Sequence, residues 1–127
     1  MKTKFFCTLM MLLIAPLSFA QLDSHWKYLG SSALYSYYGN TKDRMTVNGF
    51  EAAWLVENNK SGGSSLLLVY ANCKTGHTGI SKEIKYSKHD LEGYVIDRFD
   101  YPYMEFTLIV PDSIGETQYN FICNELY

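Results

Sequence analysis

The sequence predicts an α+β fold: an antiparallel sheet of about six strands with one C-terminal helix packed on it. Two observations lead to this fold class. Alternation of apolar and polar residues, typical of strands, recurs between turn segments, and a helical pattern appears only near the C-terminus. The chain has 127 residues, which suits one domain, and no repeat, low-complexity tract or long linker divides it.

The clearest local pattern is a hairpin over residues 50–71. Its first strand alternates, so that Phe50 and Trp54 share one face of the strand. A loop over residues 58–63 contains Asn, Ser and Gly, which favour a turn. The second strand, residues 65–71, is almost continuously apolar, which is typical of a central strand buried on both faces.

Weaker patterns predict the other strands and the helix. Further strands are expected over residues 26–28, 33–38, 80–86, 94–96 and 104–110. After Pro111, the segment from Ser113 to Glu116 has the Ser-x-x-Glu form of a capping box, in which each side chain bonds the other residue's free amide. Ile114, Phe121 and Ile122 then follow at helical spacing and predict a short amphipathic helix.

The first twenty residues have the three regions of a secretory signal peptide. Lys2 and Lys4 precede an apolar run, and small residues end the segment, so we expect cleavage after Ala20 and a mature domain over residues 21–127. A membrane anchor is the alternative, but a run of about eleven apolar residues is too short to cross ~30 Å of hydrocarbon. Gln21 occupies the position where a lipoprotein needs Cys. The chain is therefore expected to be exported, periplasmic or extracellular, soluble and not a lipoprotein.

The cysteines predict one disulfide. Cys7 lies in the signal segment, which leaves Cys73 and Cys123 in the mature domain. Two cysteines in an oxidising compartment most often pair. A redox pair and a metal site are the alternatives, but neither cysteine belongs to a Cys-x-x-Cys motif or has a His at zinc-finger spacing. We expect the bridge to fasten the C-terminal helix to the sheet.

Composition excludes several classes of function. Hydrophobic residues at 47% and charged residues at 19% exclude intrinsic disorder. The formal charge of -2, which becomes -4 when Lys2 and Lys4 leave, argues against binding to nucleic acid or to an anionic membrane. Aromatic residues reach 16% and include eleven Tyr, a content that suits either strands or an adhesive surface.

A search for catalytic or metal-binding groups finds none with the required spacing. The three histidines have no second ligand at helical spacing and are interpreted as solvated loop residues. Asp97, Asp100 and Glu105 lie close together in sequence, and paired carboxylates can serve acid–base catalysis or bind calcium. They form no calcium loop, so charged positions in a polar loop are the simpler interpretation. We expect no enzyme activity and no cofactor or metal.

Two tyrosine clusters are the candidate protein-binding residues. Tyrosine offers a large contact area at low entropic cost, together with a hydroxyl group. About half of these rings are expected to belong to the core, since strands use Tyr in any case. The candidates are Tyr35, Tyr37 and Tyr38 in the first cluster and Tyr101 and Tyr103 in the second.

The order of landmarks along the chain resembles a known family. The landmarks are Trp26, the tyrosines of residues 35–38, Trp54, a Gly/Ser loop, Asn72-Cys73, Tyr86, the turn of residues 111–116 and Cys123. This order is similar to that of the surface-adhesin protein E family of exported bacterial domains. The resemblance implies a compact sheet with a C-terminal helix joined by the cysteine pair. It also implies a protein partner, such as a host matrix or serum protein, and a homodimer.

One departure from the family pattern affects the functional expectation. The named adhesin is lipid-anchored, whereas Gln21 gives this chain no stable membrane anchor. The first hypothesis is a non-enzymatic binding module that engages another protein through a Tyr-rich sheet face or edge. The alternative is a periplasmic inhibitor or immunity-type protein, whose acidic loops would meet a basic target enzyme or toxin.

Overall fold

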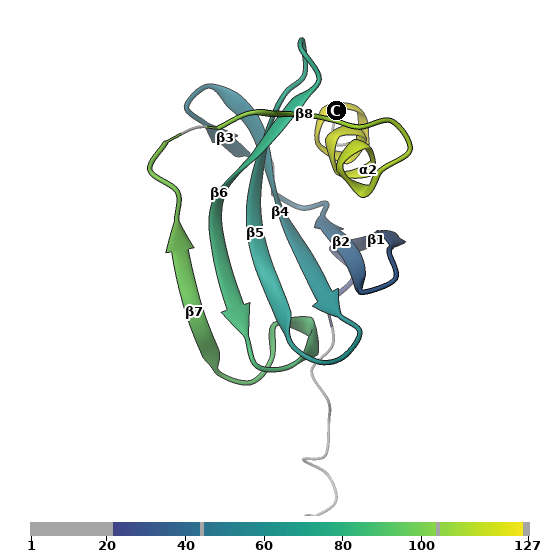
Figure 1. Cartoon of the computed structure of the whole chain (residues 1–127), viewed down its shortest axis with the longest axis vertical. Coiled ribbons are helices and arrows are strands. Elements are labelled where there is room, and N and C mark those ends of the chain that lie inside the picture. The colour runs from purple at the N-terminus through teal and green to yellow at the C-terminus, as the bar shows by residue number, and fades with distance from the viewer. Residues whose placement is uncertain (1–21, 44, 104, 126–127) are drawn as a thin grey trace, which may run out of the picture.

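The computed structural model describes residues 22–43, 45–103 and 105–125, most of which form one twisted antiparallel sheet (Figure 1). The strands are β1 (Trp26–Ser31), β2 (Tyr35–Asn40), β3 (Met45–Val47), β4 (Phe50–Asn59), β5 (Ser64–Asn72), β6 (His77–Tyr86), β7 (Val95–Asp100) and β8 (Thr107–Leu108). Six of them follow the order β1-β2-β4-β5-β6-β7, while β3 pairs with β4 and β8 pairs with β6. The predicted fold class is confirmed. The signal peptide predicted over residues 1–20 lies outside the described residues.

The predicted hairpin is confirmed as the centre of the sheet. Strands β4 and β5 pair in a continuous antiparallel register that includes Glu57 opposite Ser65. The residues from Leu67 to Ala71 are all buried, as a continuously apolar central strand requires. Because β4 and β5 lie in the middle of the strand order, their two faces carry the two halves of the core.

The helix-side face of β4 and β5 contacts the C-terminal helix. Its buried cluster consists of Ala53, Leu55, Leu67, Val69 and Ala71 with Phe121 and Ile122 of the helical segment. The opposite face holds a second cluster of Ala52, Leu68 and Tyr70, flanked by Met45, Val47, Phe50 and Trp54. Alternation along each strand therefore divides the apolar side chains between two separate clusters.

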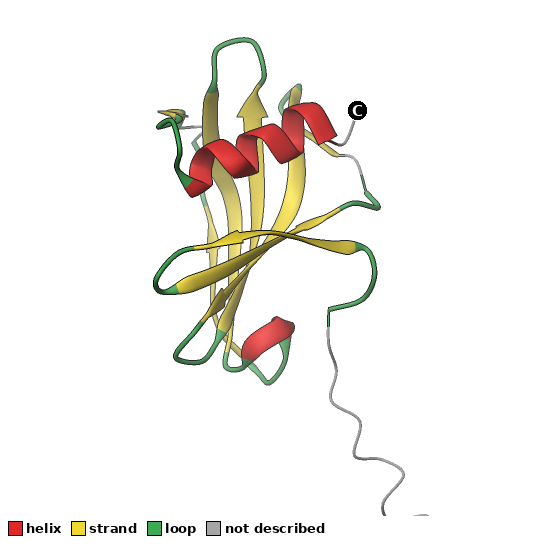
Figure 2. Cartoon of the chain, turned by 90° about the vertical axis from the view of Figure 1, so that its right-hand side faces the viewer, coloured by secondary structure: helices red, strands yellow, loops and turns green. Residues whose placement is uncertain are grey.

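The C-terminal helix begins where the capping motif predicts. The Ser113 side chain accepts a hydrogen bond of 3.2 Å from the Glu116 amide, and α2 (Ile114–Asn120) follows. The helix continues as a π-helical segment, Phe121–Glu125, and Figure 2 shows the two as one rod across the end of the sheet where β8 joins β6.

Two contacts fasten this helix to the sheet. The predicted Cys73–Cys123 disulfide is present, and Tyr119 donates a hydrogen bond of 3.0 Å to the Cys73 carbonyl. The ring of Phe121 lies so close to Gly39 of β2 that a Cβ atom at Gly39 would overlap it. The position therefore requires a residue without a side chain.

The predicted strand over residues 104–110 is wrong in extent, because only Thr107–Leu108 pairs with β6. Ahead of it, the chain packs on the opposite face of the sheet. The Phe106 ring lies 4.9 Å from the Phe50 ring and 5.1 Å from the Tyr70 ring, between ring centres, and Tyr70 donates a hydrogen bond of 2.8 Å to the Glu105 carbonyl. The Phe106 ring therefore packs on the aromatic side chains of this face, and the segment ahead of β8 does not extend a strand.

Strand β3 and a short 3-10 segment, η1 (His89–Leu91), were not predicted from the sequence. The 3-10 segment is held by reciprocal hydrogen bonds between Asn58 and Asp90, in which the Asn58 amide group donates at 2.7 Å and the Asp90 backbone amide donates at 2.9 Å. Asp90 and Leu91 have φ angles of 57° and 62°. This positive-φ turn is stabilised by a contact between segments that are distant in sequence.

Replacement of both bridging cysteines by Ala should lower the free energy of unfolding by about 4 kcal/mol, the chain-entropy value for the 50-residue separation. Urea unfolding of the C73A/C123A chain, compared with the oxidised and the reduced original chain, measures the difference. A loss below about 1 kcal/mol would show that packing alone holds the helix on the sheet.

Gly39→Ala should destabilise the chain by about 1–3 kcal/mol, because the added methyl group displaces the Phe121 ring. Gly115→Ala is the matched control. Gly115 lies in α2 with room for a Cβ, so the same change there should stabilise the chain by about 0.5–1 kcal/mol. Equal effects at the two sites would contradict the close contact between β2 and the helix.

Candidate binding surface

The helix covers one end of its sheet face (Figures 1 and 2). Polar and aromatic side chains line the remainder of that face. Directly paired residues on neighbouring strands share a face, so the register defines rows across the sheet. One row runs through Tyr37, Glu57, Ser65, Lys85 and Asp97, from β2 to β7. The adjacent row begins in the core and runs through Gly39, Leu55, Leu67, Glu83 and Phe99.

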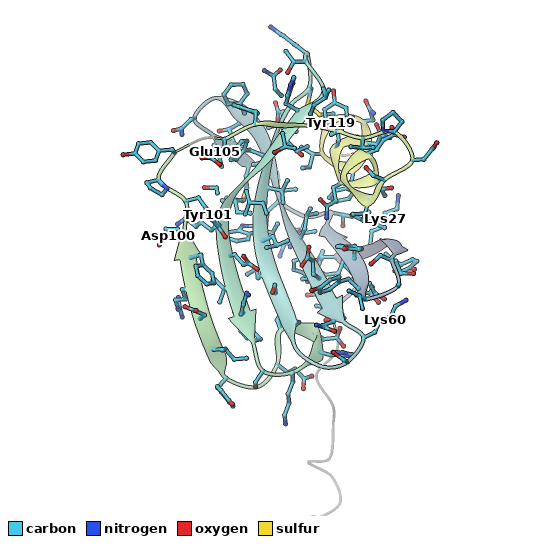
Figure 3. All side chains as sticks on the ribbon, in the orientation of Figure 1. Lys27, Lys60, Asp100, Tyr101, Glu105 and Tyr119 are labelled. Carbon is cyan, nitrogen blue, oxygen red and sulfur yellow. A yellow bond between two sulfur atoms is a disulfide. The ribbon has the colours of Figure 1, made fainter. Side chains whose placement is uncertain are left out.

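A cleft of about 420 Å³ opens between the helix and the segment that joins β7 to β8. Leu67, Val69 and Ile80 provide its apolar lining from the sheet, and Gln118 contributes from α2. Tyr101 and Glu105 line it from the connecting segment, and Figure 3 shows both residues beside β6. We call this hollow the α2 cleft.

A second hollow of about 210 Å³ adjoins the first over β4, β5 and β6. It is lined by Tyr35, Glu83, Lys85 and Ser65, among others, and we call it the β6 hollow. Glu57 lines both hollows. The two hollows therefore lie side by side, with Glu57 between them.

Glu57 occupies an unfavourable position for a negative charge. Partial burial, together with repulsion from Glu83, raises the pKa of the Glu57 carboxyl group, and the nearby Lys85 ammonium opposes the shift. Among the residues that the structure describes, no cation lies within salt-bridge distance of Glu57. The described part of the chain therefore offers the ionised carboxylate no direct counter-charge.

The neighbouring groups on β6 are already engaged. Tyr101 donates a hydrogen bond of 3.2 Å to Glu83, and partial burial followed by the Glu83 charge raises the pKa of the Tyr101 hydroxyl. The Lys85 ammonium lies 5.5 Å from the centre of the Phe99 ring, a cation–π contact. The Phe99 ring stacks on Tyr101 with the ring centres 6.5 Å apart. Tyr101 is therefore part of an ordered aromatic and charged network.

The structure brings three of the five candidate tyrosines to the two hollows and a fourth beside one of them. Tyr35 lines the β6 hollow, and Tyr101 and Tyr103 line the α2 cleft with exposed fractions of 44% and 80%. Tyr37 lies beside Tyr35 with ring centres 6.1 Å apart, but only 6% of it is exposed, and its burial raises the pKa of its hydroxyl. Tyr37 is therefore a buried residue that packs beside Tyr35 and is not itself available to a partner.

The fifth candidate, Tyr38, faces the other side of β2. Its ring packs against Tyr28, with the ring centres 5.5 Å apart. Neighbouring residues on a strand point to opposite faces, which separates Tyr38 from Tyr37.

Sequence reasoning missed Glu57 and Glu83, which lie 26 positions apart and meet only through the pairing of β4, β5 and β6. A charged residue at an inward position of the alternating strand over residues 50–57 was the available signal for Glu57. The carboxylates that the sequence singled out are dispersed. Asp97 ends the row on β7, and Asp100 lies 4.0 Å from the Lys82 ammonium at the sheet edge.

The histidines occupy turns or strand ends. His25 contacts Asp23, His77 contacts Thr75, and the His89 ring contacts the Asn59 carbonyl. Within residues 22–43, 45–103 and 105–125, no three His, Cys, Asp or Glu side chains are grouped closely enough to hold a metal ion. The same part of the chain contains no helix with the length and hydropathy needed to cross a membrane.

These features define a small disulfide-bonded α+β domain with two neighbouring hollows on one sheet face, lined by aromatic and acidic residues. A comparison with family models matches the description "Surface-adhesin protein E" over residues 26–124. The chain belongs to this family, which confirms the resemblance seen in the sequence, and it is an adhesin-like binding module. No curated protein and no solved structure matches the chain.

Glu57→Gln should raise the melting temperature near neutral pH. The raised pKa means that ionisation of Glu57 costs more in the folded than in the unfolded chain. This cost appears as the pH rises from the ordinary value of 4.5 through the raised folded-state pKa. Below that window both states hold the proton, so the advantage of the variant should disappear in acid.

Thermal unfolding of the two chains at several pH values tests this sign. Glu92→Gln, in the loop after η1, is the control and should leave the melting temperature unchanged within about 1 °C. A Glu57→Gln chain that melts lower than the original near neutral pH would show that the carboxylate is stabilised rather than strained.

Proposed function

We propose that the chain is an exported, non-enzymatic module that binds another protein through the helix-side face of its sheet. The observation that carries the proposal is the pair of neighbouring hollows, of which Tyr35 lines one and Tyr101 and Tyr103 line the other. Membership of the surface-adhesin protein E family supports a protein partner. The class of partner proposed from the family is a host matrix or serum protein.

A protein partner would gain buried aromatic area at this face. Exposed tyrosines bury a large area on binding with few rotatable bonds, and their hydroxyl groups still find hydrogen-bond partners. Tyr101 is already oriented by Glu83 and stacked with Phe99, so ordering it on binding costs little entropy. A preorganised aromatic side chain of this kind is typical of an interface hot spot.

The location of the protein is part of the proposal. The signal-like segment of residues 1–20 supports export, and Gln21 in place of Cys supports release without a lipid anchor. The module would then act in the periplasm or outside the cell. A homodimer, which the family resemblance implies, is compatible with a face that binds through strands and aromatic rings.

Tyr35→Ala and Tyr101→Ala should each weaken partner binding about tenfold, because each removes an aromatic side chain from the proposed contact. Binding of the exported chain to a panel of purified matrix and serum proteins, measured by biolayer interferometry, provides the affinities. Tyr28→Ala is the matched control. Tyr28 is 54% exposed but packs with Tyr38 on the other face, so its loss should change the affinity less than twofold.

Unchanged binding in both tyrosine variants would refute the proposed face. If the chain binds no member of the panel but lowers the activity of a co-exported enzyme or toxin, the inhibitor or immunity-type alternative replaces host-protein adhesion.

A further inference from the structure

The α2 cleft has an unbalanced charge. The residues that the structure places around it include the carboxylates of Glu57 and Glu105 and no Lys, Arg or His. Glu57 is half-buried in its lining, whereas Glu105 is exposed at its rim. Lys85, the cation that influences Glu57, lines the β6 hollow instead and lies over the Phe99 ring. The cleft therefore carries negative charge both in its lining, from Glu57, and at its rim, from Glu105.

The cleft also has an apolar lining suited to the stem of a long side chain. Leu67 and Val69 are buried in the sheet, and Ile80 is 40% exposed beside them. The ring of Tyr101 borders the same space. A partner side chain that enters here therefore meets methyl groups and an aromatic ring along its stem and a carboxylate at its end.

We propose that the α2 cleft receives an arginine side chain of the partner protein, with the guanidinium group paired to the Glu57 carboxylate and resting against Tyr101. This inference rests on the proposed function and specifies the chemistry of the partner. Charge complementarity selects a cation, and a planar guanidinium pairs bidentately with a carboxylate and stacks on an aromatic ring. A lysine ammonium is more strongly hydrated and forms neither contact as well.

Pairing with a partner's guanidinium group would also offset the unfavourable electrostatic free energy of the ionised Glu57 in the free domain. Glu57 is partly desolvated and is repelled by Glu83, so a cation that reaches it gains more Coulomb energy than it would from an exposed carboxylate. The Tyr101–Glu83 hydrogen bond keeps the Glu83 carboxylate near the site, where it adds to the negative potential of Glu57 and Glu105. Removal of the Glu57 charge should therefore weaken recognition of arginine selectively.

A small-molecule titration tests the inference without a known partner. The amide NMR spectrum of the labelled exported chain is recorded with N-acetyl-arginine-N'-methylamide and with its neutral citrulline counterpart. We expect the arginine compound to shift amides of residues that line the cleft, such as Val69, Thr78 and Ile80, and to bind about tenfold more tightly than the citrulline compound. The lysine analogue should bind between the two.

The variants separate pairing with Glu57 from general attraction to an acidic protein. Glu57→Gln should bind the arginine and citrulline compounds equally, whereas the control Glu92→Gln should keep the full preference. Glu57→Gln preserves the shape of the side chain, and its dispersed amide spectrum verifies folding. Equal binding of arginine and citrulline by the original chain, shifts away from the cleft, or an unchanged preference in Glu57→Gln would each overturn the inference.

The partner assay distinguishes this failure from failure of the proposed function. If a protein partner binds through Tyr35 and Tyr101 with an affinity that Glu57→Gln does not alter, the arginine inference is wrong and the proposed function stands. If the tyrosine variants do not change partner binding while the arginine compound still binds in the cleft, the proposed tyrosine face is wrong and the preference of the cleft for arginine stands.

Discussion

The attachment of the C-terminal helix to one end of the sheet is the constraint on which the rest of the structure depends. Phe121 and Ile122 complete the helix-side core, and the Phe121 ring fits there only because Gly39 leaves space on β2. The Cys73–Cys123 bridge then limits how far this helix can move from β5. Without the helix, the buried apolar residues of β4 and β5 would face solvent on that side.

The same attachment determines where the open surface lies. A helical segment of this length covers only part of a twisted sheet, so the character of a single strand changes along its length. On β4, Leu55 is fully buried under the helix, whereas Glu57, the next residue on the same face, lies at the junction of the two hollows. Core and candidate binding surface are thus continuous, and the position of the helix sets the boundary between them.

The sequence was most informative where local chemistry determines structure. The alternation and apolar run of β4 and β5, the cap at Ser113 and the cysteine pair each depend on short-range patterns or on composition, and the structure confirms them. The segment before β8 was predicted incorrectly because Phe106 and Tyr70, which are far apart in sequence, pack together on the opposite face. A strand-like composition cannot distinguish a paired strand from a loop whose aromatic residue packs on the sheet.

Only part of the candidate site could be predicted from the sequence, again because residues that are distant in sequence come together in the fold. Tyrosine content identified the type of contact, but the grouping of Tyr101 with Glu83 and Glu57 requires the register of four strands, including irregularities within β5–β6 and β6–β7. That register is set by packing rather than by any local motif. The tyrosines provide area and preorganisation, whereas a half-buried carboxylate provides selectivity, because an apolar group that displaces water from it leaves the charge uncompensated. The proposed preference for arginine therefore follows from the residue that composition did not single out.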